Sequence, residues 1–304
     1  MDLKKGVSAG IEISREYISV VELESGDREV TLKRCGSVEN TSLLVNPSLS
    51  AGNIADEEKF KALIKNLLDS SSINSKYIAV ALPDNSVRIT FLEFEDIPAE
   101  RERVIAMIKW NLKKTIPFSV DETVVDFQLI DTPAVENRLY RLVVVLARKT
   151  VLDQYERLLK ECHLYPNSIT PSSLAVYNLY HDTIVKPDLC ALLSVSTDRI
   201  AVLIVKNGKP CFYRSKEVDD ENEGLREILA SLNYYQDVYR AMPAEIYLVN
   251  LRLGLADLKA DLERQLGNID LKLLNMADMV KGVNASMNIF SGAAGAALKA
   301  ENEK

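Results

Sequence analysis

The sequence predicts an α/β protein of two related lobes, with a smaller α+β subdomain inserted into the first lobe. Two observations carry this prediction. Three alternating strands, an amphipathic helix and a further strand follow one another early in the chain, and the same order returns after residue 187. Between the two copies lies a stretch of roughly 80 residues with its own order of elements. At 304 residues and 47% hydrophobic composition, the chain can bury a core in each lobe.

The first lobe is predicted over residues 1–86. Its alternating segments indicate three strands joined by short turns, which are Val7–Ile13, Tyr17–Leu23 and Glu29–Ser37, with a turn at Ser25-Gly26-Asp27. An amphipathic helix follows over Asp56–Leu68, because its apolar residues recur at helical spacing. Strand Tyr77–Leu82 then completes the unit.

The insert is predicted over residues 87–165. The expected elements are strand Val87–Phe94, helix Ala99–Leu112, strands Val124–Ile130 and Tyr140–Ala147, and helix Thr150–Cys162. Trp110, the only tryptophan, is expected in the core of the insert. Lys113 and Lys114 follow it near the end of the helix. A solvated helix C-terminus is the simpler interpretation of this pair, and contact with anionic lipid or an acidic tail is the alternative.

Residues 166–186 are expected to return the chain to the first lobe through a helix with Pro171 in its first turn. The second lobe, over residues 187–286, repeats the first. Its expected elements are strands Leu189–Val195, Arg199–Lys206 and Lys209–Val218, helix Asn222–Tyr239 and strand Glu245–Val249, with a hairpin at Asn207-Gly208. The acidic stretch Asp219–Glu223 is interpreted as the capped start of the helix rather than a divalent-ion loop.

The end of the chain, residues 287–304, is expected to pack back on the first lobe. Its central part, Met287–Lys299, consists largely of glycine, alanine and serine. A helix with such small side chains can approach a neighbour unusually closely.

Composition excludes several functional classes. A net charge of -7 gives no excess of cations to neutralise a nucleic acid, so none is expected as a partner. The four cysteines lack the short paired spacing of a zinc site, and their scattered placement indicates a reducing, cytoplasmic compartment. The apolar run Val7–Ile13 is interrupted by polar residues and is too short for a membrane span or a signal peptide.

Several segments resemble the type IV pilus assembly protein PilM family of the actin-like ATPase superfamily, which also contains the cell-division protein FtsA. The similar segments are Gly10–Ile13, Ile18–Leu23, Ile116-Pro117-Phe118, Glu122–Gln128, Val143–Lys149 and Tyr155–Leu164. The resemblance runs along nearly the whole chain. It implies the actin-like (ribonuclease H-like) two-lobe fold with an inserted subdomain in the first lobe.

The same resemblance implies a cytoplasmic scaffold that is recruited to the inner membrane through a partner. In that interpretation, the protein binds the cytoplasmic N-terminal tail of a PilN-like inner-membrane protein in a groove between the first lobe and the insert. Ile116, Pro117 and Phe118 are expected to shape this groove, because an Ile-Pro-Phe turn presents a rigid apolar edge. Other pilus motor proteins and a second copy of the chain are further implied partners. A type II secretion scaffold of the GspL kind stays an alternative.

The nucleotide motifs that the resemblance implies are degenerate. In actin-like ATPases two hairpin turns hold the phosphates, and each normally carries Asp followed two residues later by Gly. This chain has Glu12 and Ser14 at the first turn, with Arg15 and Glu16 after them. Glu16 thus places a second carboxylate where phosphate oxygens would sit.

The second turn has Ser194 and Ser196, followed by Asp198, which is interpreted as a turn residue rather than a relocated ligand. The adenosine side needs two glycines, and here Val249 and Asn250 stand in their place, followed by Leu251-Arg252. These combined losses predict a pseudo-ATPase without catalytic residues, metal or obligatory cofactor. Weak binding of Mg²⁺-ATP without turnover stays open, and an ATP-binding ATPase of pilus assembly is the alternative function.

Overall fold

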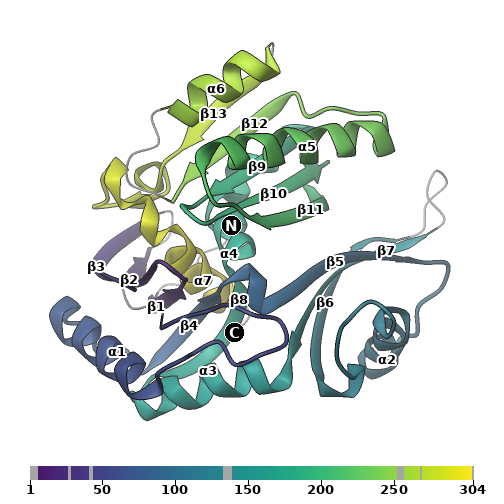
Figure 1. Ribbon diagram of the computed structural model, residues 1–304. Coiled ribbons are helices and arrows are strands. Elements are labelled where there is room, and N and C mark those ends of the chain that lie inside the picture. Colours follow the sequence, from purple (N-terminus) through teal and green to yellow (C-terminus); the bar gives the residue numbers. More distant parts are fainter. Residues whose placement is uncertain are drawn as a thin grey trace.

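The computed structural model describes residues 6–26, 29–40, 44–132, 139–251, 257–267 and 269–302. Within them the strands form three sheets (Figure 1). A six-stranded sheet with the order β14-β3-β2-β1-β4-β8 forms the first lobe, and a five-stranded sheet with the order β11-β10-β9-β12-β13 forms the second. A three-stranded sheet, β5-β7-β6, forms the insert. Asp27 and Arg252 lie outside the described residues.

The first-lobe sheet joins an antiparallel meander to parallel strands. Its strands are β1 (Gly6–Ile13), β2 (Tyr17–Ser25), β3 (Val30–Glu39), β4 (Tyr77–Leu82), β8 (Tyr165–Pro171) and β14 (Val280–Lys281). β1 pairs antiparallel with β2 and parallel with β4. Because helices cover both faces of this sheet, β1 is buried at consecutive residues from Ala9 to Ile13 rather than on alternate residues.

Four helices cover the two faces of the first-lobe sheet. They are α1 (Glu57–Ser71) and α3 (Lys149–Glu161) on one face, and α4 (Ser172–Ile184) and α7 (Ser291–Asn302) on the other. A Cβ atom added to Gly10 or Gly295 would overlap a backbone carbonyl oxygen of the neighbouring element. These two glycines therefore allow α7 to lie directly against β1 and α4.

The second lobe repeats the strand order of the first. Its elements are β9 (Leu189–Val195), β10 (Arg199–Lys206), β11 (Lys209–Glu217), β12 (Glu245–Asn250), β13 (Asp270–Leu274), α5 (Glu221–Tyr239) and α6 (Asp257–Leu266). α5 and α6 pack on one face of the sheet. The other face shares a core with α4 and α7, so these two helices lie between the sheets of the two lobes (Figure 1). The Asp220 side chain caps α5 by accepting a hydrogen bond of 2.8 Å from the Glu223 amide.

The insert is a single sheet with one covering helix. Its elements are β5 (Val87–Phe94), α2 (Arg101–Leu112), β6 (Thr123–Asp131) and β7 (Tyr140–Arg148). The short 3-10 helices of the described chain are η1 (Asp84–Ser86), η2 (Val120–Glu122), η3 (Met276–Asp278) and η4 (Ala285–Phe290). No helix among the described residues combines the length and apolar composition needed to cross a bilayer.

The positions of α3 and Trp110 differ from the sequence-based expectation. α3, expected within the insert, packs in the core of the first lobe through Tyr155 and Leu158. α2 covers one face of the insert's sheet, and the apolar stripe of α3 packs instead in the first-lobe core beside α1. The prediction that Trp110 lies in the insert core is wrong, because its side chain is 79% exposed. α2 directs Val104 and Ile108 toward the sheet, and Trp110 lies on the opposite side of the helix.

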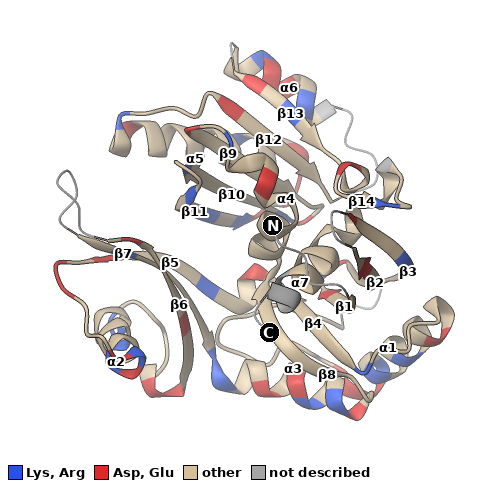
Figure 2. Cartoon of the chain, turned by 180° about the vertical axis from the view of Figure 1, so that it is seen from behind, with Lys and Arg blue, Asp and Glu red and all other residues tan. Residues whose placement is uncertain are grey.

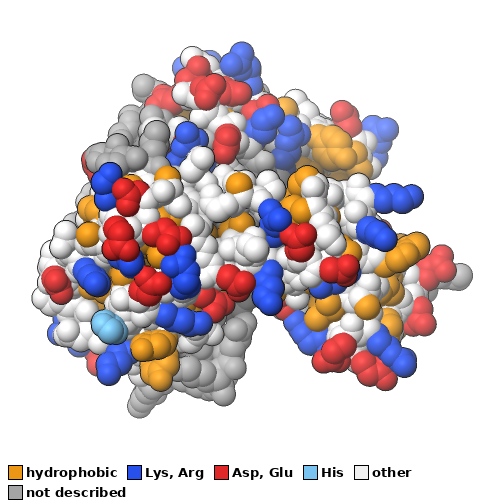
Figure 3. Space-filling view, turned by 60° about the horizontal axis from the view of Figure 1, so that its bottom comes forward, with side chains coloured by type: hydrophobic (Ala, Val, Ile, Leu, Met, Phe, Trp, Pro, Cys, Tyr) orange, Lys and Arg blue, Asp and Glu red, His pale blue; other side chains and the backbone are white. Residues whose placement is uncertain are grey.

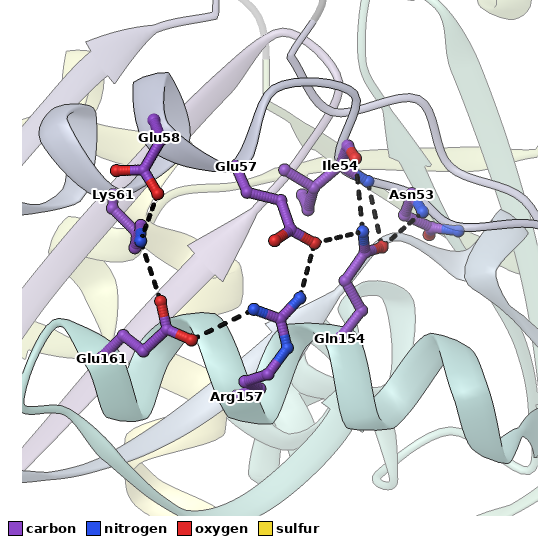
Figure 4. Close-up of polar contacts among 8 residues, drawn as sticks. All are labelled: Asn53, Ile54, Glu57, Glu58, Lys61, Gln154, Arg157 and Glu161. Atoms are coloured by element: carbon purple, nitrogen blue, oxygen red, sulfur yellow. Dashed lines mark hydrogen bonds and ion pairs between the residues drawn. The ribbon is translucent and has the colours of Figure 1, made fainter.

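Polar contacts fix α3 on the rest of the first lobe (Figure 4). The Gln154 side chain accepts a 2.7 Å hydrogen bond from the Asn53 amide and donates one of 3.2 Å to the Ile54 carbonyl. Arg157 pairs with Glu57 at 2.6 Å. A further chain of ion pairs joins Lys61 to Glu58 and Glu161. Charged side chains of both signs cover this face (Figure 3). Because exposed ion pairs are weak, the half-buried hydrogen bonds of Gln154 hold α3 more firmly.

Candidate functional site

The predicted nucleotide position is a small cavity between the lobes, where the β1–β2 and β9–β10 turns face each other. Its volume is about 20 Å³, which is enough for a single water molecule. The lining residues are Glu12, Ser14, Arg15, Glu16, Tyr17, Pro47, Pro83, Asn85, Ser196, Asp198, Arg199 and Leu251. The structure therefore brings together four predicted site residues, Glu12, Ser14, Arg15 and Ser196.

Three other predicted site residues do not line this cavity. Ser194 in β9 lies opposite Val249 in β12, and both are buried. Val249 packs in the core between the lobes, so its side chain does not face the cavity. Asn250 lies opposite Val195 in the same pair of strands. Leu251, the next residue, lines the cavity, and its amide donates a 2.9 Å hydrogen bond to the Val195 carbonyl.

Glu12 is buried at the end of β1, with an exposed fraction of 1%. Its carboxylate accepts a hydrogen bond from the Ser172 hydroxyl and lies 3.4 Å from the Tyr17 hydroxyl. A Cβ atom on Gly292 would overlap this carboxylate, so the first turn of α7 closes over it. Burial raises the pKa of Glu12 to about 7 against the opposing effects of Ser172 and Arg199. Burial therefore favours the protonated form of Glu12 at pH values where an exposed glutamate is ionised.

A buried ion pair crosses from one lobe to the other beside Glu12. Asp84 begins η1 directly after β4 in the first lobe, and Arg199 is the first residue of β10 in the second. Their side chains are 1% and 12% exposed and form an ion pair. Asp84 also accepts hydrogen bonds of 3.0 Å from both the amide and the hydroxyl of Ser173 at the start of α4. The Ser173 hydroxyl lies 3.2 Å from that of Tyr213 in β11, which extends the contact into the second lobe.

Sequence reasoning missed the Asp84–Arg199 pair. Two signals were present, because Arg199 opens a strand whose following residues are apolar, and Asp84 directly follows a strand and a proline. Each is an ordinary polar residue at a strand end when considered alone. The two residues are 115 positions apart in the sequence, and only the fold brings their side chains together.

A second polar contact joins the two turns directly. The Glu16 carboxylate in the first lobe accepts a 3.4 Å hydrogen bond from the Thr197 amide in the second. Ser196 and Asp198 complete an ordinary hairpin turn, in which the Ser196 hydroxyl donates to Asp198 at 3.0 Å. Turn amides of this kind are the groups that bind anions. Here the protein's own carboxylate occupies one of them.

Ile116, Pro117 and Phe118 lie at the junction of the insert and the first lobe. Ile116 is buried in the insert core, Pro117 is exposed, and Phe118 is half-buried. The Arg148 guanidinium lies 5.2 Å from the centre of the Phe118 ring. Arg148 also donates to the Ser50 carbonyl in the first lobe, so a single cation ties this junction together.

The insert's sheet has a second apolar face, which α2 does not cover. The strand pairing places Ile89 and Val145 on it, together with Phe91 and Val143. All four are half-buried, whereas Val124 on the neighbouring strand is 44% exposed. Figures 1 and 2 show α2 on the outer side of the sheet, so this face points toward the first lobe. An apolar sheet face without a covering helix is a surface on which an extended segment can pack.

Comparison with known proteins gives both a family and a fold. The sequence matches the family model described as type IV pilus assembly protein PilM over residues 10–222. None of the curated proteins matches it. The structure is similar to the PilM-PilN type IV pilus biogenesis complex, with a TM-score of 0.82 at 19% identity, covering 98% of this chain and 99% of that one.

Two further solved structures share the fold. One is the cytoplasmic domain of EpsL, an inner membrane component of the type II secretion system of Vibrio cholerae, with a TM-score of 0.53 at 14% identity over 97% of this chain and 95% of that one. The other is a Bacteroides thetaiotaomicron protein of unknown function with an actin-like ATPase fold, with a TM-score of 0.53 at 12% identity over 94% and 95%. The predicted actin-like fold is thereby confirmed.

Proposed function

The chain belongs to the type IV pilus assembly protein PilM family, and from this premise we propose that it is a pseudo-ATPase scaffold of a pilus assembly machine. In this function it binds the cytoplasmic tail of a PilN-like inner-membrane protein, which recruits it from the cytoplasm to the membrane. Chemistry at the inter-lobe cavity plays no part in it. An ATPase that drives assembly is the alternative.

The Asp84–Arg199 pair is the observation that carries the pseudo-ATPase proposal. In a nucleotide-driven protein of this fold, a ligand with its metal ion bridges the lobes. Here a cation and a carboxylate of the chain itself make the bridge, and the space beside them is about 20 Å³. Leaving one partner of a buried ion pair without its counter-ion typically costs about 3–5 kcal/mol, which corresponds to a loss of roughly two to nearly four orders of magnitude in ligand affinity.

The residues present do not fit Mg²⁺-ATP. A magnesium ion needs accessible oxygen ligands, usually carboxylates. Glu12 is covered by α7 and held by Ser172, and Asp84 is neutralised by Arg199. Glu16 adds negative charge where a phosphate would sit, and Leu251 lines the cavity. No step of hydrolysis is therefore assigned to this cavity.

Calorimetric titration with Mg²⁺-ATP, together with phosphate release measured with and without the partner tail, tests this proposal. We expect no measurable hydrolysis and a dissociation constant in the millimolar range at best. Micromolar binding, or turnover that the Glu12→Ala substitution abolishes, would restore the ATPase alternative.

Partner binding is proposed at the junction of the insert and the first lobe. The similarity to the PilM-PilN complex supports the kind of partner, and two features support the place. Phe118 and Pro117 form an apolar edge there, and the sheet face with Phe91 and Val143 is not covered by α2. An extended tail with alternating apolar side chains could pack along both.

Capture of the partner tail by immobilised protein tests the place of binding. Phe118→Ala should reduce capture, because it removes half of the apolar edge. Tyr77→Ala is the matched control, since Tyr77 is an exposed aromatic residue of the first lobe, and it should leave capture unchanged. Circular dichroism verifies that both variants are folded. Equal capture by the wild type and Phe118→Ala would remove Phe118 from the binding site.

A further inference from the structure

The outer side of α2 carries an unusual aromatic residue. Val104, Ile108 and Leu112 are buried against the sheet, whereas Trp110 is 79% exposed. Tryptophan presents a large apolar surface with one polar N–H, and soluble proteins seldom leave so much of it in water. The exposed indole therefore indicates a contact that the chain alone does not supply.

Three cations share this side of the helix. Arg103 precedes Trp110 by seven residues and lies on the same face of α2, and Lys113 and Lys114 follow Leu112 in the turn that ends the helix. The exposed Glu102 lies beside them as a single acidic residue of α2. The three cationic side chains are exposed, and only Arg103 has an ion pair, a loose one of 3.5 Å to Glu100. The chain as a whole has a net charge of -7, so this positive face runs against its overall charge.

The position of α2 makes this face accessible to a large, flat partner. Figures 1 and 2 show α2 at one extremity of the molecule, on the side of the insert that points away from both lobes. Figure 3 shows apolar, basic and acidic side chains next to one another over the insert. A convex helix face at an extremity can meet a plane without a clash from the lobes, and it offers no groove to a peptide.

We propose that the α2 outer face, made of Arg103, Trp110, Lys113 and Lys114, binds the anionic surface of a lipid bilayer. Indole rings favour the interface between headgroups and acyl chains, and lysine stems extend past them so that the ammonium groups reach the lipid phosphates. Each such cation strengthens binding to an anionic membrane by about five-fold. The face lacks the apolar area for stable anchoring alone and acts as a second attachment beside the bound partner tail.

The single tryptophan makes the contact directly measurable. The full chain is mixed with vesicles of neutral phosphatidylcholine, or of the same lipid with about one-third phosphatidylglycerol as anionic component. We expect a blue shift of tryptophan emission and co-flotation with the anionic vesicles alone, both weakened by added salt. No partner tail is present, so failure of this experiment leaves the proposed tail binding untouched.

Variants locate the contact on the protein. Lys113→Glu/Lys114→Glu should weaken vesicle binding by at least about 25-fold, and Trp110→Ala by roughly ten-fold in flotation. Lys65→Glu/Lys76→Glu is the matched control, because it changes the net charge equally at exposed positions of the first lobe and should bind like the wild type. Circular dichroism confirms that each variant is folded.

Three results would overturn the proposal. The first is an unchanged emission spectrum and no flotation with anionic vesicles at low salt. The second is an equal loss in the Lys65→Glu/Lys76→Glu control, since binding would then follow net charge alone. The third is that the wild type does not bind vesicles, whereas Lys113→Glu/Lys114→Glu weakens capture of the partner tail without lipid. That result would assign the face to an acidic protein segment.

Discussion

Replacing Glu12 by Gln should remove a pH dependence from the stability of this protein. The carboxylate lies between Ser172 and the first turn of α7, and burial raises its pKa from 4.5 to about 7. The folded protein therefore binds a proton that the unfolded chain releases. The resulting stabilisation is fully present below pH 4.5 and is lost as the pH rises through about 7.

The magnitude follows from the two pKa values. One pKa unit corresponds to about 1.4 kcal/mol, so the rise to about 7 corresponds to about 3 kcal/mol in total. Of this, about 2 kcal/mol should disappear between about pH 5.5 and about pH 8.5. Glutamine keeps the shape and the hydrogen-bonding oxygen but cannot ionise. Glu12→Gln should therefore gain about 2 kcal/mol relative to the wild type over that interval.

Urea unfolding of both proteins at the two pH values measures this difference, because titration of all other groups cancels between them. Glu12→Asp is the matched control, since it keeps an ionisable carboxyl group, and its stability should still fall with rising pH. A stability difference between Glu12→Gln and the wild type that stays constant with pH would refute the reasoning. It would show that the carboxylate is solvated or paired in the folded protein.

Further substitutions test the ion pair between the lobes and the close packing of α7. Arg199→Met should lower the free energy of unfolding by about 3–5 kcal/mol, because it leaves Asp84 buried without a cation, and adding Asp84→Asn should restore most of the loss in urea unfolding. A single variant as stable as the double would contradict this. Gly295→Ala should destabilise by about 3 kcal/mol and lower the melting temperature, since its Cβ would overlap the Ala175 carbonyl oxygen. Gly224→Ala in α5 is the control, because the added Cβ would make only ordinary contacts and should stabilise the helix by up to about 1 kcal/mol. Equal melting temperatures for the two alanine variants would exclude close packing of α7.

The sequence was sufficient for the elements because their signals are local. The four strands predicted in each lobe occur within about two residues of their predicted bounds, since alternation and turn residues are properties of neighbouring positions, whereas β8, β13 and β14 were not predicted. Trp110 shows where composition misled, because aromatic residues are usually buried. The helical phase set by Val104, Ile108 and Leu112 was also readable from the sequence and places Trp110 on the opposite side.

The assignment of α3 needed the tertiary structure. Its apolar stripe was visible in the sequence, but the stripe fits any apolar sheet face. α2 covers one face of the insert's sheet, and α3 packs beside α1 on the first-lobe sheet, which β8 widens. The position of α3 therefore depends on which sheet face it meets in the folded protein. The sequence of α3 alone does not determine this.

The sequence by itself determined the two-lobe order, the family and the absence of the expected aspartates and glycines at both turns. Only the tertiary structure decided what stands in their place, which is the Asp84–Arg199 pair, the contact of Glu16 with Thr197, and the closure of α7 over Glu12. The physical reason is that partners of buried charges are chosen by three-dimensional proximity, at sequence separations without periodicity. The residue type indicates that a buried charge needs a partner, and the fold determines which residue provides it.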